Sequence, residues 1–96
     1  MTHTITLVSD IYLSKTEALR ALSELLGVPI NDSEPSNAVL DLDGGVVLSI
    51  EVPKFGEDLP LTLDLSGVNL GVLEISAEMV VKHALEGLSW VLAPAK

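Results

Sequence analysis

The chain has 96 residues, and its 14 acidic and 5 basic side chains give a formal charge of −9 at neutral pH. This length is sufficient for one domain with one core, so we take residues 1–96 as a single domain, and an apolar content of 48% excludes a disordered acidic tail. The absence of cysteine excludes disulfide frameworks, thiol catalysis and thiolate metal sites.

The charge and the distribution of apolar residues indicate which partners to expect. A sequence pI near 4.3 repels phosphate backbones and attracts basic proteins, so we expect a basic protein partner and no nucleic acid. No apolar run approaches the roughly 20 residues that cross a bilayer, and the first residues lack the pattern of a signal peptide. We therefore expect a cytoplasmic protein without membrane contact.

The first two predicted elements are a strand and a helix. Apolar and polar side chains alternate from Thr4 to Ser9, which is typical of a half-buried strand. Ser14 and Glu17 have the spacing of a capping box, and apolar residues follow at helical intervals. Gly27 supplies a left-handed C-cap, so the pattern predicts a helix over residues 15–26.

A hairpin follows. Two alternating segments, residues 38–42 and 46–52, flank the turn residues 43–45. Both apolar sets share one face only if Leu42 opposes Val46, which leaves a three-residue loop with a glycine in the left-handed conformation.

The last third of the chain predicts two more strands and a helix. Residues 61–66 alternate clearly, a turn follows over residues 66–70, and residues 71–75 predict a fourth strand of the meander. From Ser76, a candidate N-cap, the period changes to 3.6 residues, and Pro94 ends the predicted helix.

The order β-α-β-β-β-β-α predicts an α+β fold. Strands with one apolar face need a cover, so we expect a two-layer sandwich in which two helices lie on one face of an antiparallel sheet of about five strands. The first strand pairs either at an edge or beside a strand distant in sequence. Phe55, in the longest strand connection, either plugs the sheet edge or is a presented side chain, and we expect the first because loops commonly pack their one aromatic residue inward.

Carboxylates gather on the polar side of the predicted meander. With the registers above, Ser49 opposes Asp64, and Thr62 lies between Glu51 and Glu74. The plain interpretation is a solvated sheet face, and the alternative is a preorganised anionic platform for a basic protein. The candidate binding residues on this platform are Asp41, Asp43, Glu51, Asp64 and Glu74.

The last predicted helix supplies a second candidate surface. At 100° per residue, Met79, His83, Glu86 and Trp90 lie opposite the apolar face. Tryptophan and methionine are enriched at interface centres, so Met79, His83 and Trp90 are candidate partner contacts. Alternatively, Trp90 folds over the helix rim or is covered by the first strand. Neither histidine has a second ligand at a metal-binding spacing, and we expect no metal or cofactor.

These observations favour a non-enzymatic binding protein. The leading hypothesis is a small acidic inhibitor, of the immunity or antitoxin type, that occludes a larger basic protein, an analogy from size and charge. A homodimer would also account for the high aliphatic content. The alternative is a small-molecule-binding domain with a cleft between sheet and helices, possibly completed by homodimerisation. An enzyme that uses the sheet carboxylates ranks third.

Overall fold

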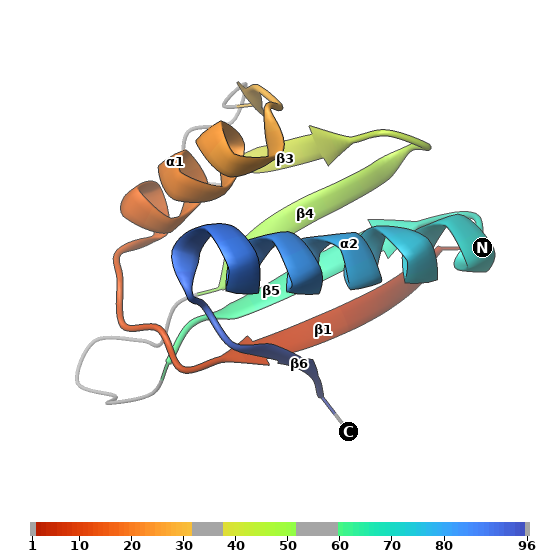
Figure 1. Ribbon diagram of the computed structural model, residues 1–96. Coiled ribbons are helices and arrows are strands. Elements are labelled where there is room, and N and C mark those ends of the chain that lie inside the picture. Colours follow the sequence, from red (N-terminus) through yellow and green to blue (C-terminus); the bar gives the residue numbers. More distant parts are fainter. Residues whose placement is uncertain (1, 32–37, 52–59, 96) are drawn as a thin grey trace.

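A computed structural model describes residues 2–31, 38–51 and 60–95, which form one antiparallel sheet with two helices on one face (Figure 1). The elements are β1 (His3–Ser9), α1 (Lys15–Leu26), β2 (Ile30–Asn31), β3 (Val39–Leu42), β4 (Val46–Glu51), β5 (Thr62–Gly67), α2 (Leu70–Leu88) and β6 (Leu92–Pro94). The predicted α+β sandwich is confirmed, with six strands in the described residues. The expectation for Phe55 lies outside the described residues.

The strands follow the order β2-β3-β4-β5-β1-β6, and every neighbouring pair is antiparallel. Of the two placements left open for the first strand, β1 takes the one beside a strand distant in sequence, because it lies between β5 and β6. The short strand β6 then forms one edge of the sheet, and β2 forms the other.

Helix α1 has the bounds that the sequence predicts. The Ser14 hydroxyl accepts a hydrogen bond from the Glu17 backbone N–H at 3.2 Å and donates one to Glu17 Oε1 at 2.9 Å. Gly27 ends the helix with φ 68°, a left-handed conformation that costs glycine little. Both helix ends are therefore specified by residues within a turn of them.

The β3–β4 hairpin also has its predicted register. Leu42 opposes Val46 across a turn in which Gly44 and Gly45 both have positive φ. Ser49 opposes Asp64 on the next strand, as the alternation predicts.

The predicted strand over residues 71–75 is wrong, because these residues belong to α2. Asn69 caps this helix by accepting a hydrogen bond from the Val72 N–H at 3.1 Å, so Ser76 is not the N-cap. Leu73, Val80 and Ala84 are fully buried along one helical face. A segment of five residues is too short for alternation to exclude this longer period.

The predicted continuation of the last helix to Pro94 is also wrong. Helix α2 ends at Leu88, and Ser89 takes a left-handed conformation with φ 57°. The Ser89 N–H donates to the Leu85 carbonyl at 3.1 Å, which is the bond of an αL C-cap, and the Trp90 N–H donates to the Ala84 carbonyl at 3.1 Å. The chain then reverses, and β6 pairs with β1.

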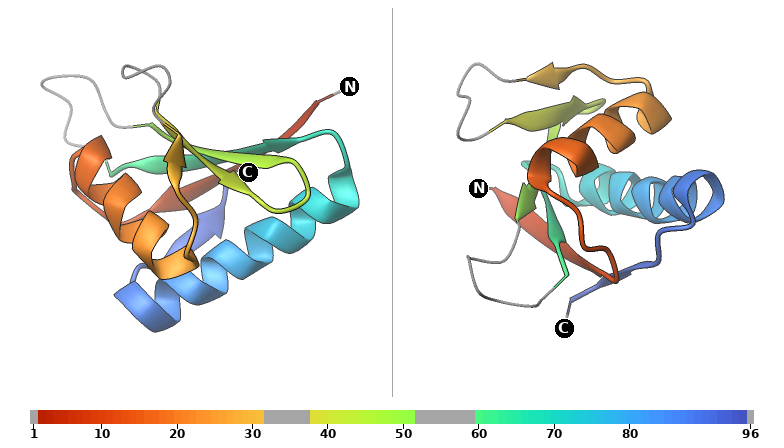
Figure 2. Two further views of the ribbon diagram at one scale, coloured as in Figure 1. Left: turned by 90° about the horizontal axis from the view of Figure 1, so that it is seen from above. Right: turned by 90° about the vertical axis from the view of Figure 1, so that its left-hand side faces the viewer.

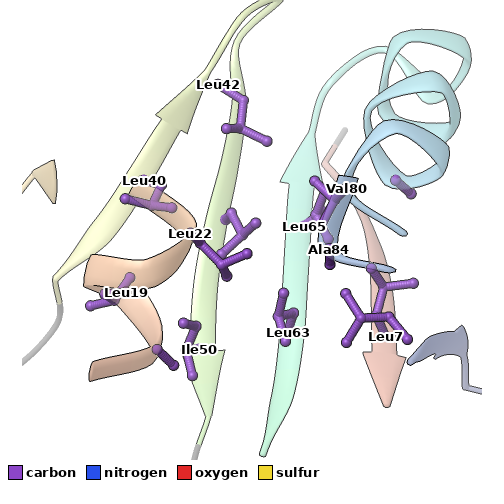
Figure 3. Close-up of a cluster of buried hydrophobic side chains, with 14 of the residues drawn as sticks. Leu7, Leu19, Leu22, Leu40, Leu42, Ile50, Leu63, Leu65, Val80 and Ala84 are labelled. Carbon is purple, nitrogen blue, oxygen red and sulfur yellow. The ribbon is translucent and has the colours of Figure 1, made fainter. Parts of the chain in front are cut away.

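The core lies between the sheet and the two helices (Figure 3). Helix α1 packs beside β3 and β4, and α2 packs beside β5 and β1. Leu48 and Leu63 from the central strands are fully buried, as is Leu22 of α1. Figure 2 shows both helices on the same side, so the opposite face of the sheet has no covering layer in the described residues.

Candidate functional site

The uncovered side of the sheet is the candidate site, and we call it the open face. Its side chains alternate along the strands with those of the buried core. The open face comprises Thr4, Thr6, Val8, Val39, Asp41, Val47, Ser49, Glu51, Thr62, Asp64 and Ser66.

A polar row crosses the middle of the open face. Ser49 of β4 opposes Asp64 of β5, which in turn opposes Thr6 of β1. The Thr6 hydroxyl donates a hydrogen bond to Asp64 Oδ1 at 2.6 Å, in a partly buried position. A short bond to an ionised acceptor restricts the carboxylate, so Asp64 presents its other oxygen in a fixed direction.

Two further carboxylates lie nearer the margins of the open face. Asp41 is exposed on β3, and its Oδ2 accepts a hydrogen bond from Asn31 Nδ2 at 3.0 Å. Glu51 is exposed at the end of β4, opposite Thr62. Asp41, Glu51 and Asp64 are therefore three negative charges spread over three adjacent strands.

The structure does not bring the other two predicted acids onto this face. Asp43 lies in the β3–β4 turn, and Glu74 is exposed on α2, in the helix layer. The prediction that Thr62 lies between Glu51 and Glu74 is wrong for the same reason, since Val8 of β1 opposes Thr62 on that side.

The predicted outward position of Trp90 is also wrong. Met79, His83 and Glu86 are exposed on α2, but Trp90 lies beyond the helix end and is only 8% exposed. The alternative of a covered tryptophan is correct, because the left-handed Ser89 turns the chain back toward the core. Met79 and His83 stay candidate contacts without a tryptophan beside them.

Two grooves flank α2 on the helix side of the molecule. The first, of about 350 Å³, lies between α1, α2 and the β3–β4 turn and is lined by Leu26, Val28, Leu42, Asp43, Gly44, Val72, Ile75, Ser76 and Met79. The second, of about 560 Å³, lies between α2, β1 and β6 and is lined by Ile5, Leu7, Glu74, Ala77, Glu78, Val81, Lys82 and Pro94. We call them the α1–α2 groove and the β1–α2 groove.

The positive charges of the described residues are distributed unevenly between the two sides of the molecule. The lysines and arginine of the described residues, Lys15, Arg20 and Lys82, all lie on helices. The described part of the open face therefore carries carboxylates without a neighbouring lysine or arginine, and the field above it is negative.

The described residues contain no group of three histidine, cysteine or carboxylate side chains placed to hold a metal ion. Neither helix in the described ranges has the length and apolar character needed to cross a bilayer. Comparisons with protein-family models, curated proteins and solved structures found no match to the chain.

Sequence reasoning missed the two side chains that orient the carboxylates, Thr6 and Asn31. The alternation in the first strand places Thr6 on the polar side, but only the pairing of β1 with β5 brings it to Asp64. Asn31 lies in a polar segment where no periodicity indicates a strand.

Proposed function

We propose that this chain is a non-enzymatic, acidic protein-binding domain that inhibits a larger basic protein by covering it with the open face. The observation that carries the proposal is an uncovered sheet face with Asp41, Glu51 and Asp64 and no lysine or arginine in its described part. A net charge of −9 adds long-range attraction for a basic partner.

The hydrogen bonds on the open face support binding by a preorganised surface. Thr6 and Asn31 restrict two of the three carboxylates before any partner arrives. A surface that is already ordered loses less conformational entropy on binding, and its free carboxylate oxygens suit lysine or arginine side chains. The rigid antiparallel sheet beneath holds these groups at fixed spacings.

The position of the carboxylates favours binding over catalysis. Both grooves lie on the helix side, whereas the three carboxylates lie on a sheet face that has no covering layer in the described residues. Acid–base catalysis by carboxylates gains from burial and from convergent neighbours, which an open surface reached by water does not supply.

We place the domain in the cytoplasm, a reducing compartment in which a chain without cysteine loses no stability.

The test compares two pairs of charge-neutralising substitutions that remove the same number of negative charges. Asp41→Asn with Asp64→Asn alters the open face, and Glu24→Gln with Glu86→Gln alters exposed helix positions. Each variant and the unmodified protein serve as bait for the same cell extract, and the association rate with the captured protein is measured from low to high salt.

We expect a basic protein that binds the unmodified chain and the helix variant but binds the open-face variant at least about tenfold more slowly. The association rate with the unmodified chain falls as ionic strength rises, and the partner's own activity falls on binding. Equal binding by both variants, or a rate independent of salt, contradicts the proposal.

The α1–α2 groove supports the second candidate function, binding of a small apolar molecule. Its volume of about 350 Å³ and mainly apolar lining with a few polar groups are typical of ligand sites. We expect the neutral fluorescent probe N-phenyl-1-naphthylamine to bind one site per chain. Ile75→Trp, which fills the groove, abolishes this binding, and Leu85→Trp, on the exposed side of α2, does not. Binding unaffected by Ile75→Trp contradicts this candidate.

A further inference from the structure

The outer edge of β1 is only partly covered by β6. On its other side β1 pairs with β5 over residues 3–8, but β6 pairs only with Leu7–Ser9, and Ala95 adds one bond from its N–H to the Thr6 carbonyl at 2.8 Å. Alternate residues of a strand turn their backbone groups to the same side, so Thr4 turns its N–H and C=O outward as Thr6 does. No described residue pairs with Thr4 on that side (Figure 1).

The β1–α2 groove runs along this same edge, beneath α2. Leu7 and Ile5 both face the helix side of β1, yet Leu7 is fully buried and Ile5 is only half-buried. Ile5 is more exposed than Leu7 because Leu7 lies opposite β6, whereas Ile5 lies beyond the part of β1 that pairs with β6. Ala77 and Val81 of α2 continue the apolar lining above Ile5, so a further strand beside β1 would bury its own side chains against them.

The charges on the rim of the groove are ordered along α2. Gly67 at the end of β5 opposes His3, and α2 begins three residues later, so its first turns lie near the uncovered half of β1. Glu74 and Glu78, which are both exposed, belong to this half, and Lys82 follows one turn later, toward β6. The uncovered half of the edge therefore has a negative rim.

We propose that the β1 edge and the β1–α2 groove bind an extended segment of a partner protein by strand addition. The segment pairs with the backbone of Thr4, places apolar side chains against Ile5 and Val81, and directs a lysine or arginine to Glu74 and Glu78. Strand addition of this kind takes affinity from backbone bonds and specificity from pockets for alternate side chains. This surface is separate from the open face, so the test of strand addition does not depend on the proposed function.

The probe is the peptide acetyl-Thr-Val-Thr-Lys-Thr-Val-Thr-amide, in which valine and lysine share one face of an extended chain. It is titrated into ¹⁵N-labelled protein, and amide shifts and hydrogen exchange are recorded. We expect slower exchange at the Thr4 amide and shifts at Ile5, Ala77 and Val81. A peptide N-methylated at every residue, which offers no backbone donors at either edge, binds at least about tenfold more weakly.

The charge contribution is tested with Glu74→Lys plus Glu78→Lys against the matched pair Glu24→Lys plus Glu86→Lys. We expect the first pair to weaken peptide binding about tenfold and the control pair to change it less than about twofold. The proposal is overturned by no binding at millimolar peptide, by equal binding of the N-methylated peptide, or by shifts confined to the open face. A dimer that shows the same protection at Thr4 without peptide also overturns it, because a second copy then occupies the edge.

Discussion

Replacement of Ser89 by glycine is expected to stabilise the fold. Ser89 has φ 57°, a conformation that costs an L-residue roughly 1–2 kcal/mol and costs glycine almost nothing. Glycine loses about 0.5–1 kcal/mol more through the flexibility of the unfolded chain. Because Ser89 is exposed, loss of its hydroxyl adds little. The net gain is about 0.75 kcal/mol, the midpoint of a difference of about 0–1.5 kcal/mol, and it corresponds to a rise in Tm of about 3–6 °C for a domain of this size.

Urea unfolding followed by tryptophan fluorescence measures this effect directly. Trp90, the single tryptophan of the chain, is nearly buried and follows Ser89, so its emission reports the turn itself. We expect the Ser89→Gly variant to have a higher urea midpoint than the unmodified protein and the same m-value. The native emission of Trp90 is blue-shifted relative to that of the unfolded chain. Glu86→Gly, within the helix, is the matched control and lowers stability by about 0.5–1 kcal/mol. A midpoint for Ser89→Gly that falls as far as the control refutes the left-handed cap.

Further substitutions test the core, the hairpin and the first helix. Leu63→Ala removes a fully buried side chain from the central strand β5, and we expect denaturant unfolding to show a loss of about 2–5 kcal/mol. Gly44→Ala and Gly45→Ala both place a side chain at positive φ, but only the first sets a Cβ 2.5 Å from Val72 Cγ1. We expect Gly44→Ala to lower Tm more than Gly45→Ala, and equal losses would exclude that contact. Ser14→Ala removes the cap of α1 and costs about 1 kcal/mol, measured as a lower urea midpoint.

The elements that sequence reasoning placed correctly are those with signals close in the chain. The capping box at Ser14 and the left-handed Gly27 define α1 within a turn at each end. The two apolar sets around Asp43 to Gly45 permit a single register, in which Leu42 opposes Val46. The alternation of the next pair of strands also predicted Ser49 against Asp64 correctly. Asp41, Glu51 and Asp64 follow on the polar side because strand alternation carries them there.

The errors occurred where the deciding interactions are ambiguous locally or distant in sequence. Asn69 caps α2, but a short alternating run after it fits a strand equally well. A serine in the left-handed region is uncommon, so no residue near position 89 indicates the end of the helix. The helix was therefore extended too far, and Trp90 was predicted on its outward face. The bond from Thr6 to Asp64 joins residues 58 positions apart, and only the tertiary fold brings them together.

The position of Pro94 at the rim of the sheet affects how copies of the chain meet in concentrated solution. Pro94 opposes Leu7, whereas the neighbouring Ala95 N–H bonds to Thr6, so the ring nitrogen of Pro94 points away from the sheet. This nitrogen has no hydrogen to offer to a neighbouring molecule, and the opposite rim, β2, is two residues long. Pro94 and the shortness of β2 therefore disfavour the addition of further strands at these two places, whereas the backbone of Thr4 on β1 stays open to one.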